Sequence, residues 1–510
     1  MTETNNAAQY FVDRHLDEGR GEKAVFREAA GAKRSTSYAQ LAGRSAQVAG
    51  ALMRAGIRRE ERAVMLVLDQ IEAPEIFWGC LKAGVIPVPL NTMLATPVYD
   101  AILRDSRATC LFLSEELCDV VLPATQSNPY LREIIVIGAA SANTQSFSEF
   151  MADAPELPMV DVSPDDVAFW LYSSGSTGIP KGVKHVHSSL KATADTYGAQ
   201  VLGIREDDVI YSAAKIFFAY GLGNAMSFPM SVGATTILFN GRPTPDVVCD
   251  ILANESPSIF CGVPTLYAAM IAHLEKAGAP DCPLRLCISA GEALPAETGR
   301  NWNQLWGVDI LDGVGSTEML HIFLSNAPGD VDYGTSGVAV PGYDLRLVDE
   351  QDQDVGDGAL GELLVRGASS SDGYWNQRAK TRSTFLGDWT RTGDKYERRA
   401  DGRYIYCGRT DDMFKVSGQW VSPFEVEQAL AEHPDVLEAA VVAARDAEGL
   451  EKPKAFIVLT EGDKRADLAD RLRDFVKDRV GLWKYPRWIE IVEDLPKTAT
   501  GKIQRFRLRQ

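Results

Sequence analysis

The sequence predicts an α/β protein with two domains: a large N-terminal domain of layered α/β sheets with a barrel-like region, and a small α+β C-terminal domain. The chain has 510 residues, more than a single compact core usually holds. Helical and strand-like apolar patterns alternate through its first 330 residues, as in largely parallel sheets covered by helices. Beyond that point, short strands between Gly- and Asp-rich turns indicate an antiparallel or barrel-like region.

The elements of the N-terminal part follow from their periodicity. Residues 38–53 repeat apolar side chains at helical spacing. Short runs rich in β-branched and aromatic residues predict strands over 63–67, 109–113, 133–137 and 167–172. The barrel-like region is expected to contain strands over 345–348 and 361–366.

A domain boundary is predicted near residues 408–412. After it, residues 423–430 predict a helix that begins with proline, a favoured first residue. Strands are expected over 439–443 and 455–459, and an amphipathic helix over 467–480. About 100 residues suffice for a small domain, so we expect domains over 1–410 and 411–510.

Charge and cysteine content limit the classes of function. The net charge is −18, of which residues 412–510 carry only −1, so general nucleic-acid binding is not expected. No run approaches the length of a membrane helix, and the N-terminus lacks the pattern of a signal peptide, so no membrane association is expected. Eight scattered cysteines without a Cys-x-x-Cys pair favour reduced thiols in a cytoplasmic protein.

Residues 172–183 have the composition of a phosphate-binding loop. Small residues let the backbone approach an anion, and N–H groups, hydroxyls and a lysine can then surround it. A solvated Ser/Gly loop is the alternative, and the common P-loop is excluded because Pro180-Lys181-Gly182 replaces Gly-Lys-Ser/Thr. The candidate phosphate-binding residues are Ser173, Ser174, Gly175, Ser176, Thr177, Gly178 and Lys181.

This stretch resembles the phosphate loop of the adenylate-forming superfamily, which includes acyl-CoA synthetases, adenylation domains of peptide synthetases and beetle luciferases. Further segments match in the family's order across nearly the whole chain. The resemblance implies ATP, Mg²⁺ and coenzyme A as cofactor and co-substrates. It also implies a distorted β-barrel in the N-terminal domain and a mobile C-terminal domain.

Several segments resemble the family's nucleotide site. Residues 289–295 match a segment that borders the adenine, which implies roles for Gly291, Glu292 and Ala293, although alone they predict only a strand-to-helix turn. In the segment 312–318, the resemblance implies that Asp312 helps to bind the nucleotide, that Thr317 contacts the α-phosphate and that Glu318 helps to hold Mg²⁺. Asp394 matches a ribose-binding aspartate and Arg409 an arginine that contacts the nucleotide; a β-turn is the alternative for such short stretches.

The remaining family residues fall near the C-terminus. Lys502, in Thr500-Gly501-Lys502, matches the lysine that stabilises negative charge during adenylation, and with Thr317 and Glu318 it completes the candidate catalytic set. Without the resemblance it is a solvated lysine in an exposed turn. Asp411 matches the hinge of the mobile domain, and the resemblance places Lys415, Ser417 and Gly418 beside the pantetheine tunnel.

Residues 212–223 and 315–326 closely resemble benzoate- and 4-hydroxybenzoate-CoA ligases within this superfamily. The resemblance implies an acyl pocket made of Ala219, Tyr220, Gly221, Ala290, Gly315, His321 and Ile322. Small residues beside aromatic and aliphatic walls suit a planar ring. For His321 two interpretations stay open: it hydrogen-bonds a para-hydroxyl of the substrate, or it is a packing residue that is hydrogen-bonded to the backbone.

The expected function is an ATP-dependent ligase that converts benzoate or a hydroxybenzoate, with 4-hydroxybenzoate favoured, to its CoA thioester through an aryl-AMP intermediate, releasing AMP and pyrophosphate. One alternative is an adenylation enzyme that loads a carrier protein. The other is a non-catalytic nucleotide-binding regulatory protein. The expected partner is an aromatic carboxylic acid, and a monomer and a homodimer fit equally well.

Overall fold

The computed structural model describes residues 5–141, 143–173, 180–416, 419–446, 448–460, 467–481, 484–497 and 503–509. The chain divides into two compact units. Unit 1 comprises Met1–Asp344 and Val365–Thr390, and unit 2 comprises Leu345–Leu364 and Arg391–Gln510. The predicted boundary between residues 410 and 411 concerns a hinge, and it stays a prediction.

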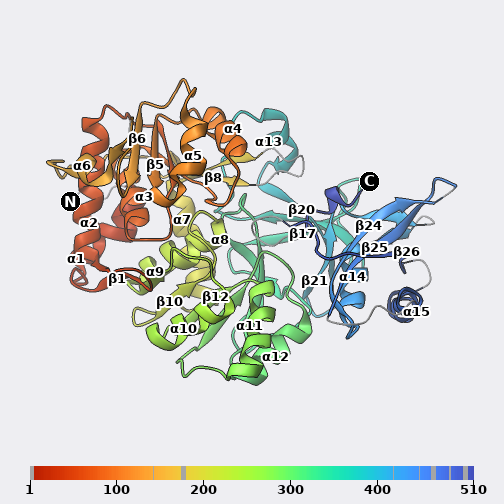
Figure 1. Ribbon diagram of the computed structural model, residues 1–510. Coiled ribbons are helices and arrows are strands. Elements are labelled where there is room, and N and C mark those ends of the chain that lie inside the picture. The colour runs from red at the N-terminus through yellow and green to blue at the C-terminus, as the bar shows by residue number, and fades with distance from the viewer. Residues whose placement is uncertain are drawn as a thin grey trace. The chain divides into compact units, whose positions relative to one another are not determined.

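The largest sheet of unit 1 has nine strands in the order β16-β15-β14-β13-β12-β10-β11-β1-β2. Figure 1 labels β1, β10 and β12 of this sheet. The six strands from β14 to β1 in this order run parallel, and antiparallel strands close both edges. Its strands are β1 (Ala24–Glu28), β2 (Ser35–Ser37), β10 (Val209–Ser212), β11 (Thr235–Leu238), β12 (Ile259–Gly262), β13 (Leu286–Ser289), β14 (Ile310–Gly315), β15 (Ile322–Ser325) and β16 (Val338–Ala339).

A second sheet of unit 1 is parallel throughout, in the order β4-β3-β5-β6-β7. A separate antiparallel pair, β8 and β9, carries the phosphate-loop sequence between its strands. These strands are β3 (Arg62–Leu66), β4 (Ile86–Pro89), β5 (Cys110–Ser114), β6 (Glu133–Ile137), β7 (Gln145–Ser146), β8 (Val167–Ser173) and β9 (Lys181–Val186). The predicted α/β layers with largely parallel sheets are confirmed.

The predicted barrel-like region is a five-stranded sheet in the order β17-β18-β20-β19, with β21 also paired to β20. The divisions between the two units fall inside β17, β18 and β20. The strands are β17 (Asp344–Val348), β18 (Leu360–Arg366), β19 (Phe385–Leu386), β20 (Trp389–Arg398) and β21 (Tyr404–Arg409).

The C-terminal part of unit 2 has the predicted α+β composition. A hairpin of β22 (Phe414–Val416) and β23 (Gln419–Val421) precedes α14 (Pro423–Ala431), which begins with Pro423 and whose N-cap Ser422 accepts a hydrogen bond from the Glu425 N–H. The three-stranded sheet contains β24 (Val436–Arg445), β25 (Glu451–Leu459) and β26 (Trp488–Ile491). The predicted amphipathic helix is α15 (Leu468–Val480).

The other helical elements connect or cover the strands. They are η1 (Gln9–Asp13), α1 (Arg14–Asp17), α2 (Tyr38–Arg54), α3 (Glu72–Ala83), α4 (Thr96–Ser106), η2 (Glu115–Leu117), α5 (Cys118–Thr125), α6 (Phe147–Met151), α7 (His187–Thr193), η3 (Ala194–Val201), α8 (Ala219–Leu222), η4 (Gly223–Ser227), α9 (Phe228–Val232), α10 (Pro245–Glu255), α11 (Pro264–Ala277), α12 (Ala296–Trp306), α13 (Arg378–Thr384) and η5 (Arg505–Arg507). Among the described residues, no helix is long and apolar enough to cross a membrane.

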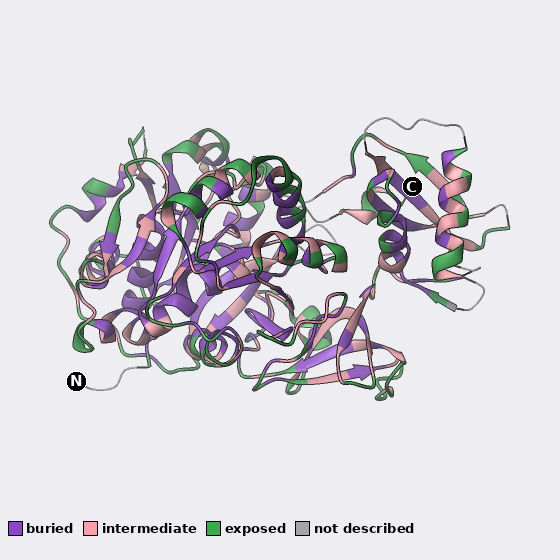
Figure 2. Ribbon diagram, turned by 90° about the horizontal axis from the view of Figure 1, so that it is seen from below, coloured by how far each residue is buried: buried purple, intermediate pink, exposed green. Residues whose placement is uncertain are grey.

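Buried residues concentrate on the strands and on the inner faces of the helices (Figure 2). One core cluster packs α10, α11 and α12 against the nine-stranded sheet, around Tyr267 and Trp302. A second lies on the five-stranded parallel sheet around Trp170. Unit 2 has its own core, in which α14 and α15 pack on β24 and β25. The parallel strands of unit 1 are therefore held by packed layers, and several of the candidate site residues follow the carboxyl ends of these strands.

Candidate active site

The β8–β9 hairpin places two predicted phosphate-binding residues opposite each other. Ser173 ends β8 and Lys181 begins β9, and the two are direct partners in the strand register. The Ser173 Oγ is buried and has no hydrogen-bond partner among the described residues. Lys181 holds its ammonium 4.8 Å from the centroid of the Tyr374 ring. The predicted residues between these strands, Ser174, Gly175, Ser176, Thr177 and Gly178, lie outside the described residues.

The segment after β14 is fixed by contacts from two other parts of unit 1. The His185 Nε2, on β9, lies 2.8 Å from the Thr317 carbonyl oxygen. Because a carbonyl only accepts, Nε2 carries the proton, and burial lowers the pKa of His185 to about 4, so the ring stays neutral. The Ser371 N–H donates to the Glu318 carbonyl at 2.8 Å. Thr317 and Glu318 are therefore held beside the phosphate-loop strands.

The Glu318 carboxylate is oriented by a neutral donor. The Tyr374 hydroxyl donates to Glu318 Oε1 at 2.8 Å. No group of three or more His, Cys, Asp or Glu side chains that could enclose a metal exists among the described residues. Magnesium is usually held by one or two carboxylates together with phosphate oxygens and water, so a single oriented carboxylate near β9 fits Mg²⁺ bound with a nucleotide.

The predicted adenine-side residues follow β13, at the carboxyl end of the nine-stranded sheet. Gly291 has φ +98°, a conformation that side chains rarely adopt, and it turns the chain toward α12. Glu292 and Ala293 lie in the same turn. Asp312, on β14 opposite Ser289 of β13, accepts a hydrogen bond from the Leu294 N–H at 3.4 Å. Burial raises the pKa of Asp312 to about 8.

The predicted acyl-pocket residues gather around Tyr220. Its hydroxyl lies 3.1 Å from the Gly262 carbonyl oxygen of β12 and 3.0 Å from the Ile288 carbonyl oxygen of β13, which anchors α8 on the strand ends. Ala219 and Gly221 share this helical turn; a side chain at Gly221 would collide with the Lys215 carbonyl. Ala290 is buried two residues after Ile288, and Gly315 pairs with Ile322 between β14 and β15.

His321 has one bonded and one open ring nitrogen. Nε2 lies 3.2 Å from the Tyr220 carbonyl oxygen, so it donates there and Nδ1 is left as an acceptor. Nδ1 is buried and has no hydrogen-bond partner among the described residues. Burial lowers the pKa of His321 to about 3. The backbone bond that sequence reasoning offered as one interpretation is present, and the ring still has an acceptor for a ligand.

In unit 2, Asp394 and Arg409 form a tight pair. They are direct partners between β20 and β21. The Arg409 Nη1 donates to Asp394 Oδ1 and to the Thr392 carbonyl oxygen, both at 2.9 Å. The carboxylate raises the pKa of Arg409 above its already high ordinary value. This arrangement brings the two predicted nucleotide-binding residues together.

The other predicted residues of unit 2 are only partly placed. Lys415 is paired with Glu350 at 3.2 Å, and its ammonium lies 4.5 Å from the centroid of the Trp420 ring. Asp411 is exposed in the turn between β21 and β22. Ser417, Gly418 and Lys502 lie outside the described residues. Their predicted roles, like those of the residues above, stay predictions.

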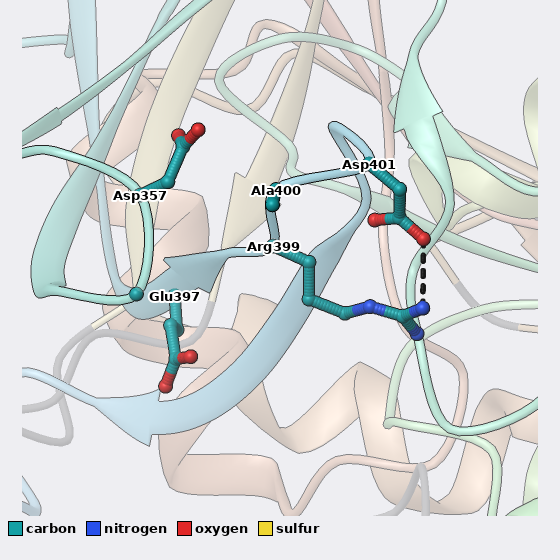
Figure 3. A pocket seen from close by; sticks show the side chains of 6 residues that line it. Asp357, Glu397, Arg399, Ala400 and Asp401 are labelled. Atoms are coloured by element: carbon teal, nitrogen blue, oxygen red, sulfur yellow. Dashed lines mark hydrogen bonds and ion pairs between the residues drawn. The ribbon is translucent and has the colours of Figure 1, made fainter.

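Unit 2 also has an open depression of about 480 Å³ that contains none of the predicted site residues (Figure 3). Three acidic side chains and Arg399 line it, and Arg399 is paired with Asp401 at 2.7 Å. No described feature of this depression points to a ligand.

Sequence reasoning missed two residues that hold the site together, His185 and Tyr374. The alternating burial of β9 puts His185 on the same inner face as Val183, so a strand pattern could have indicated a buried histidine. Tyr374 carries no such signal. It follows an ordinary Asp-Gly turn, and its contacts come from segments far away in the sequence.

The class of protein that this fold and site define is confirmed by comparison with known proteins. Residues 12–375 match the model of the AMP-binding enzyme family, and residues 425–502 match the C-terminal domain of AMP-binding enzymes. The chain belongs to this family of adenylate-forming enzymes.

Within this family, the chain is similar to individual ligases that act on aromatic acids. The chain is 54% identical to a 4-hydroxybenzoate–CoA/benzoate–CoA ligase of Rhodopseudomonas palustris, over 99% of this chain and 94% of the relative. It is 50% identical to a benzoate–CoA ligase of Thauera aromatica, over 100% and 96%. Its fold matches the crystal structure of a benzoate CoA ligase from Burkholderia xenovorans with a TM-score of 0.90 and 46% identity, each chain being covered fully. An anthranilate CoA ligase crystallised with anthranoyl-AMP gives 0.94 and 40%, with 100% and 97% coverage.

Proposed function

We propose that this protein is an ATP-dependent aryl-CoA ligase. It activates benzoate or a hydroxybenzoate, 4-hydroxybenzoate being favoured, as the aryl-AMP with release of pyrophosphate, and then transfers the acyl group to CoA with release of AMP. The observation that carries the proposal is the 54% identity, over 99% of the chain, to a 4-hydroxybenzoate–CoA/benzoate–CoA ligase. The small and aromatic residues gathered around Tyr220 and His321 support an aromatic acid.

In the first step the substrate carboxylate attacks the α-phosphorus of ATP, and the bond to the pyrophosphate oxygen breaks. We assign Lys181 and the Ser173 hydroxyl to hold the leaving phosphates, and Thr317 to contact the α-phosphate. Bound Mg²⁺ supplies charge neutralisation at the phosphates, and Glu318 is the side chain that would hold it. In unit 2, Asp394 would accept hydrogen bonds from the ribose hydroxyls while Arg409 keeps its carboxylate in place.

The second step requires a thiol in place of pyrophosphate. The CoA sulfur attacks the acyl carbon, the bond to the AMP oxygen breaks, and the thiol proton leaves to solvent. We assign Lys502 to the first step and the backbone near Gly418, with Ser417 and Lys415, to the second. Rotation of the C-terminal domain, residues 411–510, about Asp411 would present each set in turn, which makes the motion a gate rather than part of the chemistry.

Para-hydroxyl recognition follows from the tautomer of His321. A ring hydroxyl can donate to the open Nδ1, whereas benzoate leaves that nitrogen without a donor from the substrate. An unsatisfied buried acceptor costs about 1–3 kcal/mol, and a pocket built to bond a hydroxyl rejects the analogue that lacks it. This asymmetry supports 4-hydroxybenzoate over benzoate.

Chromatography of the thioester tests both parts of the proposal. Enzyme, ATP, Mg²⁺ and CoA are incubated with benzoate or 4-hydroxybenzoate, and we expect both aryl-CoA products, with the higher kcat/KM for 4-hydroxybenzoate. Accumulation of aryl-AMP without thioester would instead indicate a carrier protein as acceptor. Absence of both products would contradict the aryl substrate.

A variant of His321 tests the hydroxyl contact. We expect His321→Leu to lower kcat/KM for 4-hydroxybenzoate about 10-fold, in keeping with the loss of one buried hydrogen bond. Benzoate serves as the internal control, since it makes no such contact and should lose much less. Equal losses on both substrates would mean that His321 acts by packing alone.

We also propose that the protein acts in the cytoplasm. All eight cysteines are free, and abundant reduced thiols are typical of the cytoplasm, where ATP and CoA are supplied.

A further inference from the structure

The segment 369–375 contacts both β9 and the segment that bears Glu318. Its backbone pairs with β9: the Asp372 N–H donates to the Lys184 carbonyl at 2.8 Å, and the Trp375 N–H donates to the Gly182 carbonyl at 2.8 Å. Tyr374 lies between these two bonds, opposite Val183. Its backbone is therefore fixed relative to Lys181.

The Tyr374 side chain reaches both predicted charged groups of the phosphate site. Its ring centroid is 4.8 Å from the Lys181 ammonium, and its hydroxyl donates to Glu318 Oε1 at 2.8 Å. The side chain is buried and packs against the Phe385 ring at 5.5 Å between centroids. A single rigid side chain thus touches the cation on one side and the carboxylate on the other.

Each contact has a definite physical effect. The ring face attracts an ammonium through its quadrupole, which favours one position of the flexible lysine. The bond from a phenol to a carboxylate is charge-assisted and directional; with Oε1 engaged, the direction of Oε2 is set as well. Because the phenol is neutral, it orients the carboxylate without offsetting the charge that a divalent cation needs.

We propose that Tyr374 is a positioning residue that couples Glu318, the proposed metal-binding carboxylate, to Lys181, the proposed phosphate-binding lysine. Through its hydroxyl it orients Glu318 for Mg²⁺, and through its ring it holds Lys181 for the phosphates. The size of this one side chain then sets the distance between the carboxylate and the ammonium. The inference rests on the proposed function, since it takes Glu318 as the metal-binding carboxylate. It assigns the two effects to different atoms of the same side chain.

The two effects can be separated by substitution. Tyr374→Phe keeps the ring beside Lys181 and removes only the hydroxyl, so metal binding should weaken while metal-free nucleotide binding is unchanged. Tyr374→Leu removes both contacts, so both should weaken. A matched control is Tyr99→Phe, which removes the hydroxyl of another buried tyrosine, on α4, that donates to the Asn91 carbonyl at 3.0 Å.

Binding is measured without turnover. Mn²⁺ replaces Mg²⁺ and is titrated by electron paramagnetic resonance into the full-length protein saturated with an ATP analogue whose α–β bridge is a methylene group. We expect Tyr374→Phe to weaken Mn²⁺ binding about 10-fold, the usual effect of losing a partner of a metal ligand. Calorimetry without metal should show a loss of about 5-fold in analogue affinity for Tyr374→Leu only, the size of one partly desolvated cation–π contact.

A double-substitution cycle shows whether Tyr374 acts through Glu318. In a Glu318→Gln background, Tyr374→Phe should cause no further loss of Mn²⁺ affinity. The inference is overturned if Tyr374→Phe binds Mn²⁺ like wild type, if Tyr99→Phe loses as much, or if the two losses at 318 and 374 simply add. Failure of the proposed function is a separate result: the variants would show the metal effects above while wild type forms no aryl-CoA.

Discussion

The carboxylate of Glu318 in unit 1 is held by a neutral partner, whereas that of Asp394 in unit 2 is held by a cation. Glu318 accepts a hydrogen bond from the neutral phenol of Tyr374 at 2.8 Å, whereas Asp394 is paired with the guanidinium of Arg409 at 2.9 Å. Both side chains are fixed, but only one keeps its negative charge unopposed by the contact that fixes it.

This difference agrees with the roles proposed for the two residues. A carboxylate that must bind a divalent cation would lose affinity if a protein cation already neutralised it. A carboxylate that accepts hydrogen bonds from ribose hydroxyls needs position more than net charge, and Arg409 supplies that position. The comparison teaches that the chemistry of the partner, as much as the carboxylate itself, indicates which ligand it serves.

The largest effect is expected at Lys502, the lysine proposed to act in adenylation. Lys502→Ala should reduce aryl-AMP formation about 100- to 1000-fold, the size of losing one donor to a developing negative charge. The thioester step from supplied aryl-AMP should keep most of its rate. Rapid-quench measurement of each half-reaction separates the two, and equal losses in both would refute the assignment of Lys502 to adenylation.

Removing the unopposed charge in unit 1 should have the next largest effect. Glu318→Gln keeps the shape of the side chain and loses its charge, so we expect about a 100-fold fall in aryl-AMP formation at low Mg²⁺, partly recovered at high Mg²⁺. Pyrophosphate exchange into ATP, followed across a Mg²⁺ titration, measures this. A variant with an unchanged Mg²⁺ requirement would remove Glu318 from the metal site.

Much of the fold could be predicted because local sequence patterns, such as runs of β-branched residues and helix caps, determine its strands and helices. The strand over residues 133–137 is found with the predicted bounds, since the four consecutive β-branched residues after Glu133 favour a strand. The helix predicted over 423–430 begins at the predicted residue, because a capping serine and a proline define its start, and it ends one residue later than predicted.

The contacts of the site could not be predicted in the same way. Short motifs indicated which residue types face the phosphates, but the Tyr374–Glu318 bond spans 56 residues and the His185–Thr317 bond spans 132. Both depend on how separate segments pair in space, which no local periodicity encodes. His321 shows the same limit: its position was predicted, but its open nitrogen follows from a carbonyl 101 residues away.

The paired carboxylate of unit 2 should respond differently from Glu318. Asp394→Asn keeps a hydrogen-bond acceptor but loses the ion pair, so we expect KM for ATP to rise about 10-fold with no change in the Mg²⁺ requirement. Steady-state kinetics at several Mg²⁺ concentrations test this. A shifted Mg²⁺ requirement in this variant would erase the distinction drawn between the two carboxylates.

A third carboxyl, Asp312, extends the comparison to a group that is buried among neutral partners, and the expected effect is the smallest. Burial raises its pKa to about 8, so the folded state holds its proton at neutral pH while the unfolded chain releases it. Its contribution to stability is fully present below the unfolded pKa near 4 and is lost as the pH rises toward 8, by up to about 1.4 kcal/mol per pH unit. Urea unfolding between pH 5 and 8 should therefore show a shallower pH dependence for Asp312→Asn than for wild type. Parallel curves for the two proteins would mean that Asp312 is ionised in the fold, and burial would then not separate it from Glu318.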